Sequence, residues 1–222
     1  MPSKTLLFCT SYIADQQAWQ QRYKRWLEHY RQASPGHYLL CMIDDASPFV
    51  PPEKSLSRYM ALDEIPLNVA RPFMLSFPER LGRQALTVYP GWWRSFFSAL
   101  RVAQHLGCDR IVHAESDFYV LSQKMFRELG KIEQGWWAGW CPRYNCAETA
   151  LQVICADQFA TMKLLSDTDH KRFENQFAEE ILPFSGFLRQ FDGDRYSEFR
   201  RKIPANADYA AQVLPEQAVW LK

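Results

Sequence analysis

The sequence predicts an α/β protein in which helices flank a mixed, mainly parallel sheet within a single domain. Three observations lead to this prediction. Short, fully apolar runs, which are typical of buried parallel strands, alternate with amphipathic helical patterns. Several of these runs end in small or acidic residues, as strands do where a sheet carries a ligand at its edge. A length of 222 residues is sufficient to bury one substantial core.

The first predicted unit is a strand, a helix and a second strand. Residues 5–10 form an apolar strand, and Asp15 caps a helix that ends at Ser34-Pro35-Gly36. An apolar stripe at helical spacing marks the face that packs on the sheet: Trp19, Tyr23, Trp26, Leu27 and Tyr30. A second apolar strand follows over residues 37–43. Because such parallel units are right-handed, both strands end at the same edge of the sheet.

Small and acidic residues follow these two strands. Thr10-Ser11-Tyr12 ends the first strand, where a nucleotide base or ribose can approach. Asp44 and Asp45 follow the second strand, and an acidic residue at this place commonly holds a ribose hydroxyl. The alternative is that these aspartates form an Asx-turn leading into Pro48.

Residues 49–90 contain many prolines and arginines, which predicts short strands and loops. Arg80 and Arg83 are candidates to reach phosphates, although exposed arginines need no such role. Helical spacing of apolar residues then predicts a helix from residue 92 to residue 106, which Gly107 ends. Its N-terminal end near Arg94 should lie at the ligand edge, where the helix dipole and the arginine favour an anion.

The strand after this helix runs into a pair of carboxylates. Ile111 and Val112 are apolar, and Glu115-Ser116-Asp117 places two acids one residue apart. Divalent cations prefer oxygen ligands, so Glu115 and Asp117 could hold a metal that in turn holds a diphosphate. The alternative is a loop with two solvated carboxylates.

The second half of the chain continues the alternation of strands and helices. The expected elements are a helix capped by Ser122, an aromatic strand over 135–140, a strand over 149–156, a helix capped by Asp157, and a helical stripe through Phe173, Phe177 and Ile181. Residues 141–148 should form a polar connection. After Pro183 the chain is polar and irregular, which predicts a lid over the site or an exposed terminus.

Composition and charge limit the classes of function. The formal net charge of +1 gives no basic excess for binding nucleic acid. No apolar run is long enough to cross a bilayer, and residues 1–4 lead directly into a strand, not into a signal peptide. We therefore expect a cytoplasmic protein whose six cysteines are reduced. Peripheral contact with the inner face of the membrane stays open, because a small apolar patch would suffice for it.

Two of these motifs resemble motifs of the GT-A class of nucleotide-sugar-dependent glycosyltransferases, family 2 in particular. The segment 43–48 looks like the stretch (V/I)DD(G/A)S of that class, and Glu115-Ser116-Asp117 looks like a variant of its DxD motif. The resemblance covers about the first two-thirds of the chain. It implies a GT-A fold, with a nucleotide-sugar-binding half over residues 1–121 and an acceptor-side half and tail over residues 122–222.

The resemblance also implies roles for individual residues. Asp44 or Asp45 would contact the base or ribose. Asp117 would bind Mn²⁺ or Mg²⁺, and Glu115 would assist the metal or touch the ribose. The family usually has aspartate where this chain has Glu115.

The resemblance also implies a catalytic acid in a later acidic region and the reaction that it serves. Glu179 and Glu180 resemble the region whose acid deprotonates the acceptor in inverting members, and a solvated helical face is the alternative. The implied reaction moves a sugar from a nucleotide-diphosphate sugar, with a UDP-sugar favoured, to a glycan or a lipid-linked acceptor in surface glycan biosynthesis. The oligomeric state stays open.

Two other functions remain in view. A protein that kept this fold as a binding or scaffold module and lost turnover is favoured by glutamate at position 115. A nucleotidyltransferase would also use carboxylates on an α/β sheet, but it generally carries a glycine-rich phosphate loop after the first strand. Thr10-Ser11-Tyr12-Ile13 offers no such loop.

Overall fold

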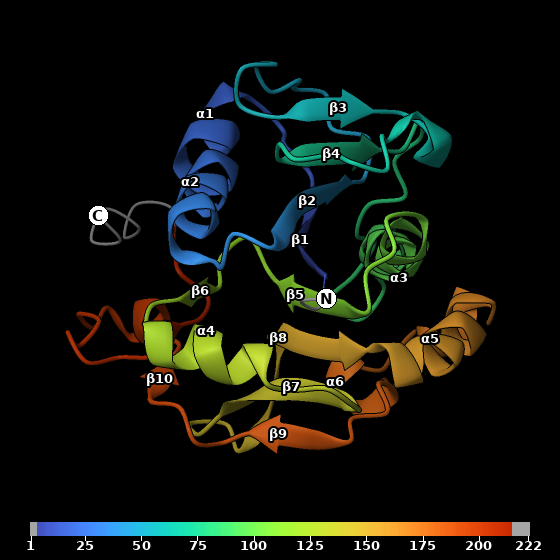
Figure 1. The fold of residues 1–222 in the computed structure, drawn as a ribbon. Helices are drawn as coiled ribbons and strands as arrows, with labels where there is room; N and C mark the ends of the chain where they lie inside the picture. The colour runs from blue at the N-terminus through green and yellow to red at the C-terminus, as the bar shows by residue number, and fades with distance from the viewer. Residues whose placement is uncertain (1–3, 215–222) are drawn as a thin grey trace.

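The central sheet has eight strands in the order β3-β4-β2-β1-β5-β8-β7-β9 (Figure 1). This computed structural model describes residues 4–214. The strands are β1 (Thr5–Ser11), β2 (Tyr38–Asp44), β3 (Ser57–Tyr59), β4 (Phe73–Ser76), β5 (Arg110–Ala114), β7 (Trp136–Cys141), β8 (Cys146–Cys155) and β9 (Gly186–Leu188). The strands from β3 to β5 in this order are parallel, whereas β8 is antiparallel to both of its neighbours. The sheet is therefore mixed and mainly parallel, which confirms the predicted fold class.

The parallel part of the sheet positions the residues that were expected at its edge. β1 pairs with β2 along its whole length, from Thr5 opposite Tyr38 to Ser11 opposite Asp44. β1 pairs with β5 on its other side. The carboxyl ends of these three strands consequently meet at one edge, because parallel strands share their direction.

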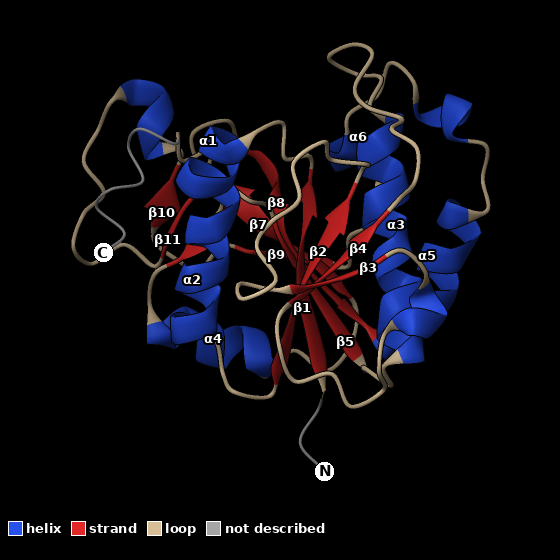
Figure 2. Cartoon of the chain, turned by 90° about the horizontal axis from the view of Figure 1, so that it is seen from above, coloured by secondary structure: helices blue, strands red, loops and turns tan. Residues whose placement is uncertain are grey.

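Helices cover both faces of the sheet, as Figure 2 shows. One face carries α1 (Gln16–Ala18), the π-helical segment η1 (Trp19–Tyr23), α2 (Lys24–Ala33) and α4 (Gln123–Gly130). The other face carries α3 (Pro90–His105) and α5 (Phe159–Ser166). Each layer buries its own aromatic core, which contains Trp19 and Trp26 on the first face and Trp93 and Phe96 on the second. Within residues 4–214, no helix has both the length and the apolar character needed to cross a membrane.

The two predicted N-caps at the starts of the first-face helices are present. The side chain of Asp15 accepts a hydrogen bond from Ala18 N at 2.8 Å. Ser122 accepts one from Met125 N at 3.1 Å. Each bond satisfies a backbone N–H that has no partner within its helix, so the sequence pattern correctly located both helix starts.

Short elements fill the rest of the chain. They are β6 (Tyr119–Val120), β10 (Gly193–Asp194) and β11 (Tyr209–Ala210), the 3₁₀ segments η2 (Leu62–Glu64), η3 (Ala156–Gln158), η4 (His170–Phe173) and η5 (Tyr196–Phe199), and the single turn α6 (Ala178–Ile181). β10, β11 and β6 form a second, three-stranded sheet. The region after Pro183 therefore contains strands of both sheets.

The predicted polar connection over residues 141–148 is too long, because only residues 142–145 connect the two strands. β7 extends to Cys141 and β8 begins at Cys146. These two residues lie opposite each other in the strand register of the hairpin, and both are free cysteines. The pairing shifts register between Ala138, opposite Gln152, and Gly139, opposite Glu148, so that this bulge leaves residues 149–151 of β8 without a partner in β7. Such a shift breaks the two-residue alternation from which a strand is recognised in a sequence.

Two helix predictions in the second half are also wrong. Asp157 does not cap α5, because both of its carboxylate oxygens accept the N–H of Gly135 at 3.0 Å. Phe173, Phe177 and Ile181 do not share one helix, since η4 ends at Phe173 and α6 begins only at Ala178. Tertiary contacts here outweigh the local helical spacing.

Candidate functional site

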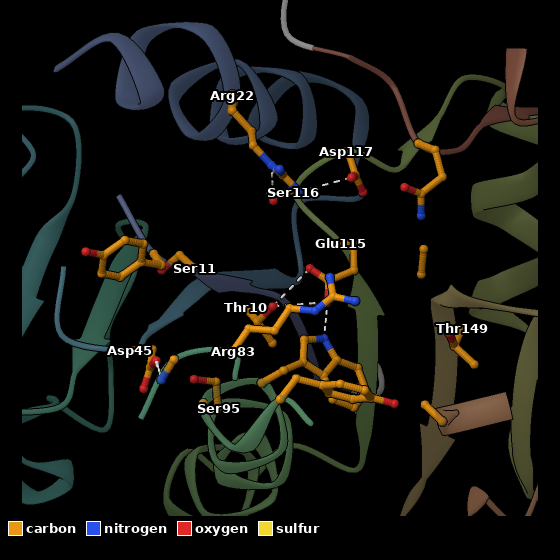
Figure 3. Close-up of a pocket in the computed structure, with 18 of the residues that line it drawn as sticks. Thr10, Ser11, Arg22, Asp45, Arg83, Ser95, Glu115, Ser116, Asp117 and Thr149 are labelled. Atoms are coloured by element: carbon orange, nitrogen blue, oxygen red, sulfur yellow. Dashed lines mark hydrogen bonds and ion pairs between the residues drawn. The ribbon is translucent and has the colours of Figure 1, made fainter. Parts of the chain in front are cut away.

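A pocket of about 500 Å³ lies at the carboxyl ends of β1, β2 and β5 (Figure 3). Among its lining residues are nine that the sequence singled out: Thr10, Ser11, Tyr12, Asp45, Arg80, Arg83, Glu115, Asp117 and Glu179. Asp44, Arg94 and Glu180 do not line it. A pocket of this size at this edge is the place where open α/β sheets bind ligands.

Asp44 and Arg94 lie behind the residues that line the pocket, and each contacts one or more of those residues or their loop. Asp44 is fully buried and accepts hydrogen bonds from Ser11 Oγ at 3.1 Å and Ser47 N at 2.9 Å. The bond from Ser47 N agrees with the alternative interpretation, in which Asp44 stabilises the turn that leads into Pro48. Arg94 donates to Asp45 and so reaches the pocket only through that aspartate.

Asp45 fixes the loop that forms one side of the pocket. Its Oδ1 accepts Leu81 N at 3.2 Å and its Oδ2 accepts Gly82 N at 2.7 Å. A Cβ atom on Gly91, at the start of α3, would lie 2.2 Å from this same Oδ2. The missing side chain of Gly91 thus lets the aspartate, the loop and the helix start meet.

Glu115 is surrounded by donors. Thr10 Oγ1 lies 3.0 Å from both carboxylate oxygens, and Trp92 Nε1 donates to Oε1. His113 Nε2 lies 3.2 Å from the same Oε1. Burial raises the pKa of Glu115, but His113, Trp92 and Arg22 outweigh burial and hold it below its ordinary value. Glu115 is therefore a carboxylate whose oxygens are already engaged by side chains of the protein.

Asp117 is paired with an arginine that the sequence did not single out. Arg22 Nη2 lies 3.0 Å from Asp117 Oδ2, and Arg22 Nε donates to Ser116 Oγ at 2.7 Å (Figure 3). Burial raises the pKa of Asp117 above its ordinary value, with Arg22 opposing this shift and Glu115 reinforcing it. Arg22 lies in η1, where Lys24 N bonds to Trp19 O, five residues back.

The predicted metal ligands do not fit a divalent cation as they are arranged. Across residues 4–214, no group of three or more His, Cys, Asp and Glu side chains is placed to hold a metal ion. Thr10 and Trp92 already use acceptor sites of Glu115 that a cation would need, and the positive guanidinium of Arg22 lies against Asp117, where it repels a cation. Glu115 and Asp117 as metal ligands therefore remain a prediction that these contacts do not favour.

Two further arginines stand on the loop held by Asp45. The Arg80 guanidinium lies 3.7 Å from the centre of the Tyr12 ring. Arg83 donates to the carbonyls of Ala85 at 3.0 Å and Leu86 at 2.8 Å. Both arginines are exposed and line the pocket. They form no ion pair with a carboxylate of residues 4–214, so they can receive an anion.

The opposite wall comes from β8, α6 and the chain near β10. Glu148, whose side chain is 2% exposed, accepts Arg195 Nε at 2.6 Å and Arg195 Nη2 at 3.2 Å. Burial raises the pKa of Glu148, although Arg195 opposes this. Beside this pair, Thr149 Oγ1 donates to Glu179 at 3.0 Å. Glu179 is thus the acid of the later acidic region that faces the pocket.

Glu180 has a different position from its neighbour. Its carboxylate accepts Phe177 N at 3.0 Å and closes the start of α6. This contact is local to one turn and directs Glu180 away from the pocket. Of the two predicted catalytic acids, the structure brings only Glu179 to the site.

Sequence reasoning missed Arg22, Trp92, Glu148 and Arg195. Arg22 and Trp92 lie in segments expected to be helical, but outside the apolar stripes by which those helices were predicted to pack on the sheet. Glu148 was assigned to a connection, and Arg195 to an irregular tail. A usable signal was the charge itself, because a buried acid in a strand requires a cation from elsewhere in the chain.

No protein-family model matches the chain, and no curated protein matches it in sequence. Solved structures do match in fold. The glycosyltransferase GlyE of Streptococcus pneumoniae TIGR4 aligns in its apo form with 97% of this chain and 55% of its own, at 9% identity and a TM-score of 0.54. A second GlyE structure aligns with 98% of this chain and 56% of its own, at 12% identity and a TM-score of 0.50.

A mannosyltransferase of Pyrobaculum calidifontis, solved with GDP-mannose and Mn²⁺, aligns with 73% of this chain and 47% of its own, at 13% identity and a TM-score of 0.48. The chain spans about half the length of these three structures. Its fold is the GT-A fold of nucleotide-sugar glycosyltransferases, as the motifs of the sequence implied.

Proposed function

We propose that this chain is a glycosyltransferase that moves a sugar from a nucleotide-diphosphate sugar to an acceptor hydroxyl. One observation carries the proposal. Within a GT-A fold, the pocket at the carboxyl ends of β1, β2 and β5 has arginines on one side and, on the other, the carboxylate of Glu179, which forms no ion pair within residues 4–214. Cations for a diphosphate and a base for a hydroxyl are the two requirements of this reaction.

In this proposal, the donor lies along the edge formed by β1 and the loop after β4. Thr10, Ser11 and Tyr12 contact the base and ribose, with Asp45 holding the loop against them. The diphosphate lies toward Arg80 and Arg83, whose guanidinium groups bind phosphate oxygens. A UDP-sugar is the donor that we expect, and a GDP-sugar is the first alternative to test.

The reaction breaks the bond between the anomeric carbon and the diphosphate oxygen and forms a bond from that carbon to the acceptor oxygen. Glu179 takes the proton of the acceptor hydroxyl, which makes this oxygen a better nucleophile. The arginines stabilise the negative charge that develops on the leaving diphosphate. Because the expected ligands do not fit Mn²⁺ or Mg²⁺, no step here depends on either ion. A glycan or lipid-linked acceptor, surface glycan biosynthesis and membrane contact remain predictions from the resemblance.

The test combines ligand binding with turnover. The melting temperature is measured with UDP, GDP, CDP, ADP and dTDP, and release of nucleoside diphosphate is measured with the matching sugar donors. At a ligand concentration about 100 times the Kd, native-state binding stabilises by about 2.7 kcal/mol, or about 8 °C for a chain of this size. Glu179→Gln should keep this shift and lose about 100-fold in turnover.

Glu174→Gln is the matched control, because Glu174 is exposed and does not line the pocket. It should change neither binding nor turnover. Binding without release of nucleoside diphosphate from any donor would favour the binding or scaffold protein that kept the fold. Failure of all five nucleotides to bind would contradict the proposed function.

A further inference from the structure

Most carboxylates of the pocket already form ion pairs or hydrogen bonds with side chains of the protein itself. Asp45 is paired with Arg94, and Glu148 with Arg195. Glu115 accepts hydrogen bonds from Thr10 and Trp92. The remaining acid of the motif, Asp117, has Arg22 against it at 3.0 Å. A divalent cation would have to displace a guanidinium to reach this motif.

Arg22 retains capacity to bind a further group. A guanidinium has five N–H donors, and the bonds to Ser116 and Asp117 use only part of them. The side chain of Arg22 is 37% exposed and lines the pocket, whereas that of Asp117 is 17% exposed. The arginine, not the acid, is thus the more accessible member of the pair. Ser116 and Asp117 fix its planar group, which suits it to bind phosphate oxygens through two bonds.

The helix that carries Arg22 adds an independent observation. Arg22 lies in the π-helical segment η1, between the α-helical segments α1 and α2. Single π-turns inside α-helices are rare and occur frequently at functional sites. Here the π-turn supplies two of the residues that line the pocket, Arg22 and Tyr23.

We propose that Arg22 takes the place of a divalent cation at this motif and binds the donor diphosphate directly, so that nucleoside diphosphate binding needs no metal. Asp117 and Ser116 are then positioning residues for the guanidinium. This inference rests on the proposed function, because it concerns the same donor in the same pocket.

The test is calorimetric titration of the purified chain with the nucleoside diphosphate that gives the largest thermal shift. The titration is done in excess EDTA and again in excess Mn²⁺. We expect the two Kd values to agree within about threefold, less than 1 kcal/mol. A Kd measurable only with Mn²⁺ overturns this inference and leaves the proposed function intact. No binding under either condition overturns both.

Substitutions identify the responsible side chain. In EDTA, Arg22→Gln should weaken nucleoside diphosphate binding about tenfold or more and leave binding of the corresponding nucleoside unchanged. Arg31→Gln, an exposed arginine on the same helix, is the charge-matched control and should bind as the unsubstituted chain does. Equal affinities of the Arg22 and Arg31 variants for the diphosphate would overturn the inference.

Asp117→Asn distinguishes two possible roles of Asp117, which are to position Arg22 and to bind a divalent cation. If Asp117 only positions Arg22, this variant keeps nucleoside diphosphate binding in EDTA to within a fewfold, because asparagine still accepts a hydrogen bond. If Asp117 holds a cation, the variant loses the binding that Mn²⁺ supports. Unchanged melting temperatures without ligand establish that each variant is folded.

Discussion

At the scale of single residues, the buried acid Glu148 depends on one cation. Its side chain is 2% exposed, and Arg195 meets it with two nitrogens, at 2.6 and 3.2 Å. Removing the arginine would leave a charge in a place that water scarcely reaches. Losing one member of a buried pair costs more than the pair contributes, because the remaining charge stays desolvated.

We therefore predict that Arg195→Leu lowers the free energy of unfolding by about 3 kcal/mol near neutral pH. Burial already raises the pKa of Glu148, and loss of Arg195 raises it further. A carboxyl with a raised pKa binds its proton more tightly in the folded state, so the variant regains stability as the pH falls. Urea unfolding at about pH 7 and about pH 5 should show this recovery.

The double variant Glu148→Gln/Arg195→Leu is the control for the titrating group. With no carboxyl at position 148, the difference between the two pH values should disappear. A recovery of equal size in the double variant would show that another group causes it.

At the scale of elements, one aspartate joins a strand end, a loop and a helix start. Asp45, directly after β2, accepts the N–H groups of Leu81 and Gly82. Gly91 in the first turn of α3 leaves the space that its carboxylate occupies. The loop that carries Arg80 and Arg83 thus has a fixed position relative to the sheet.

Gly91→Ala should disrupt this junction, because the new Cβ would lie 2.2 Å from Asp45 Oδ2 and 2.8 Å from Gly82 N. We expect a loss of about 2 kcal/mol, or about 6 °C in melting temperature, together with weaker nucleotide binding. Gly130→Ala, at a glycine of α4 with no atom within 4 Å of the added Cβ, should not lower stability, because alanine favours the helical backbone, and should leave nucleotide binding unchanged. Wild-type stability in Gly91→Ala would show that the junction relaxes without cost.

The same elements show what the sequence could predict. The strands β1, β2 and β5 are short apolar runs with polar ends, and Asp15 and Ser122 cap their helices by local bonds. Such features depend on neighbours in the sequence and were predicted correctly. The position of Arg22 depends on a π-turn, and that of Glu148 on a bulge and on Arg195, 47 residues away. These features depend on tertiary contacts, so no local pattern indicates them.

At the scale of the whole molecule, a net charge of +1 hides an uneven distribution of charge. Asp45 and Glu148 are neutralised by Arg94 and Arg195, whereas Arg80 and Arg83 have no carboxylate partner among the ion pairs of residues 4–214. The overall charge gives no indication of a polyanion. It could not indicate a local anion site, because that site results from which acids are already paired.

Binding of a diphosphate should therefore depend on salt through these exposed arginines. Arg80→Gln/Arg83→Gln should weaken nucleoside diphosphate binding about tenfold at low ionic strength and by less at high ionic strength, since salt screens exposed charges beyond about 10 Å at 0.1 M. Arg127→Gln, an exposed arginine of α4 outside the pocket, should keep both the affinity and its salt dependence. Calorimetric titrations over a series of salt concentrations measure this. An unchanged salt dependence in the double variant would place the diphosphate away from the loop, because the charges that salt screens would then lie elsewhere in the pocket.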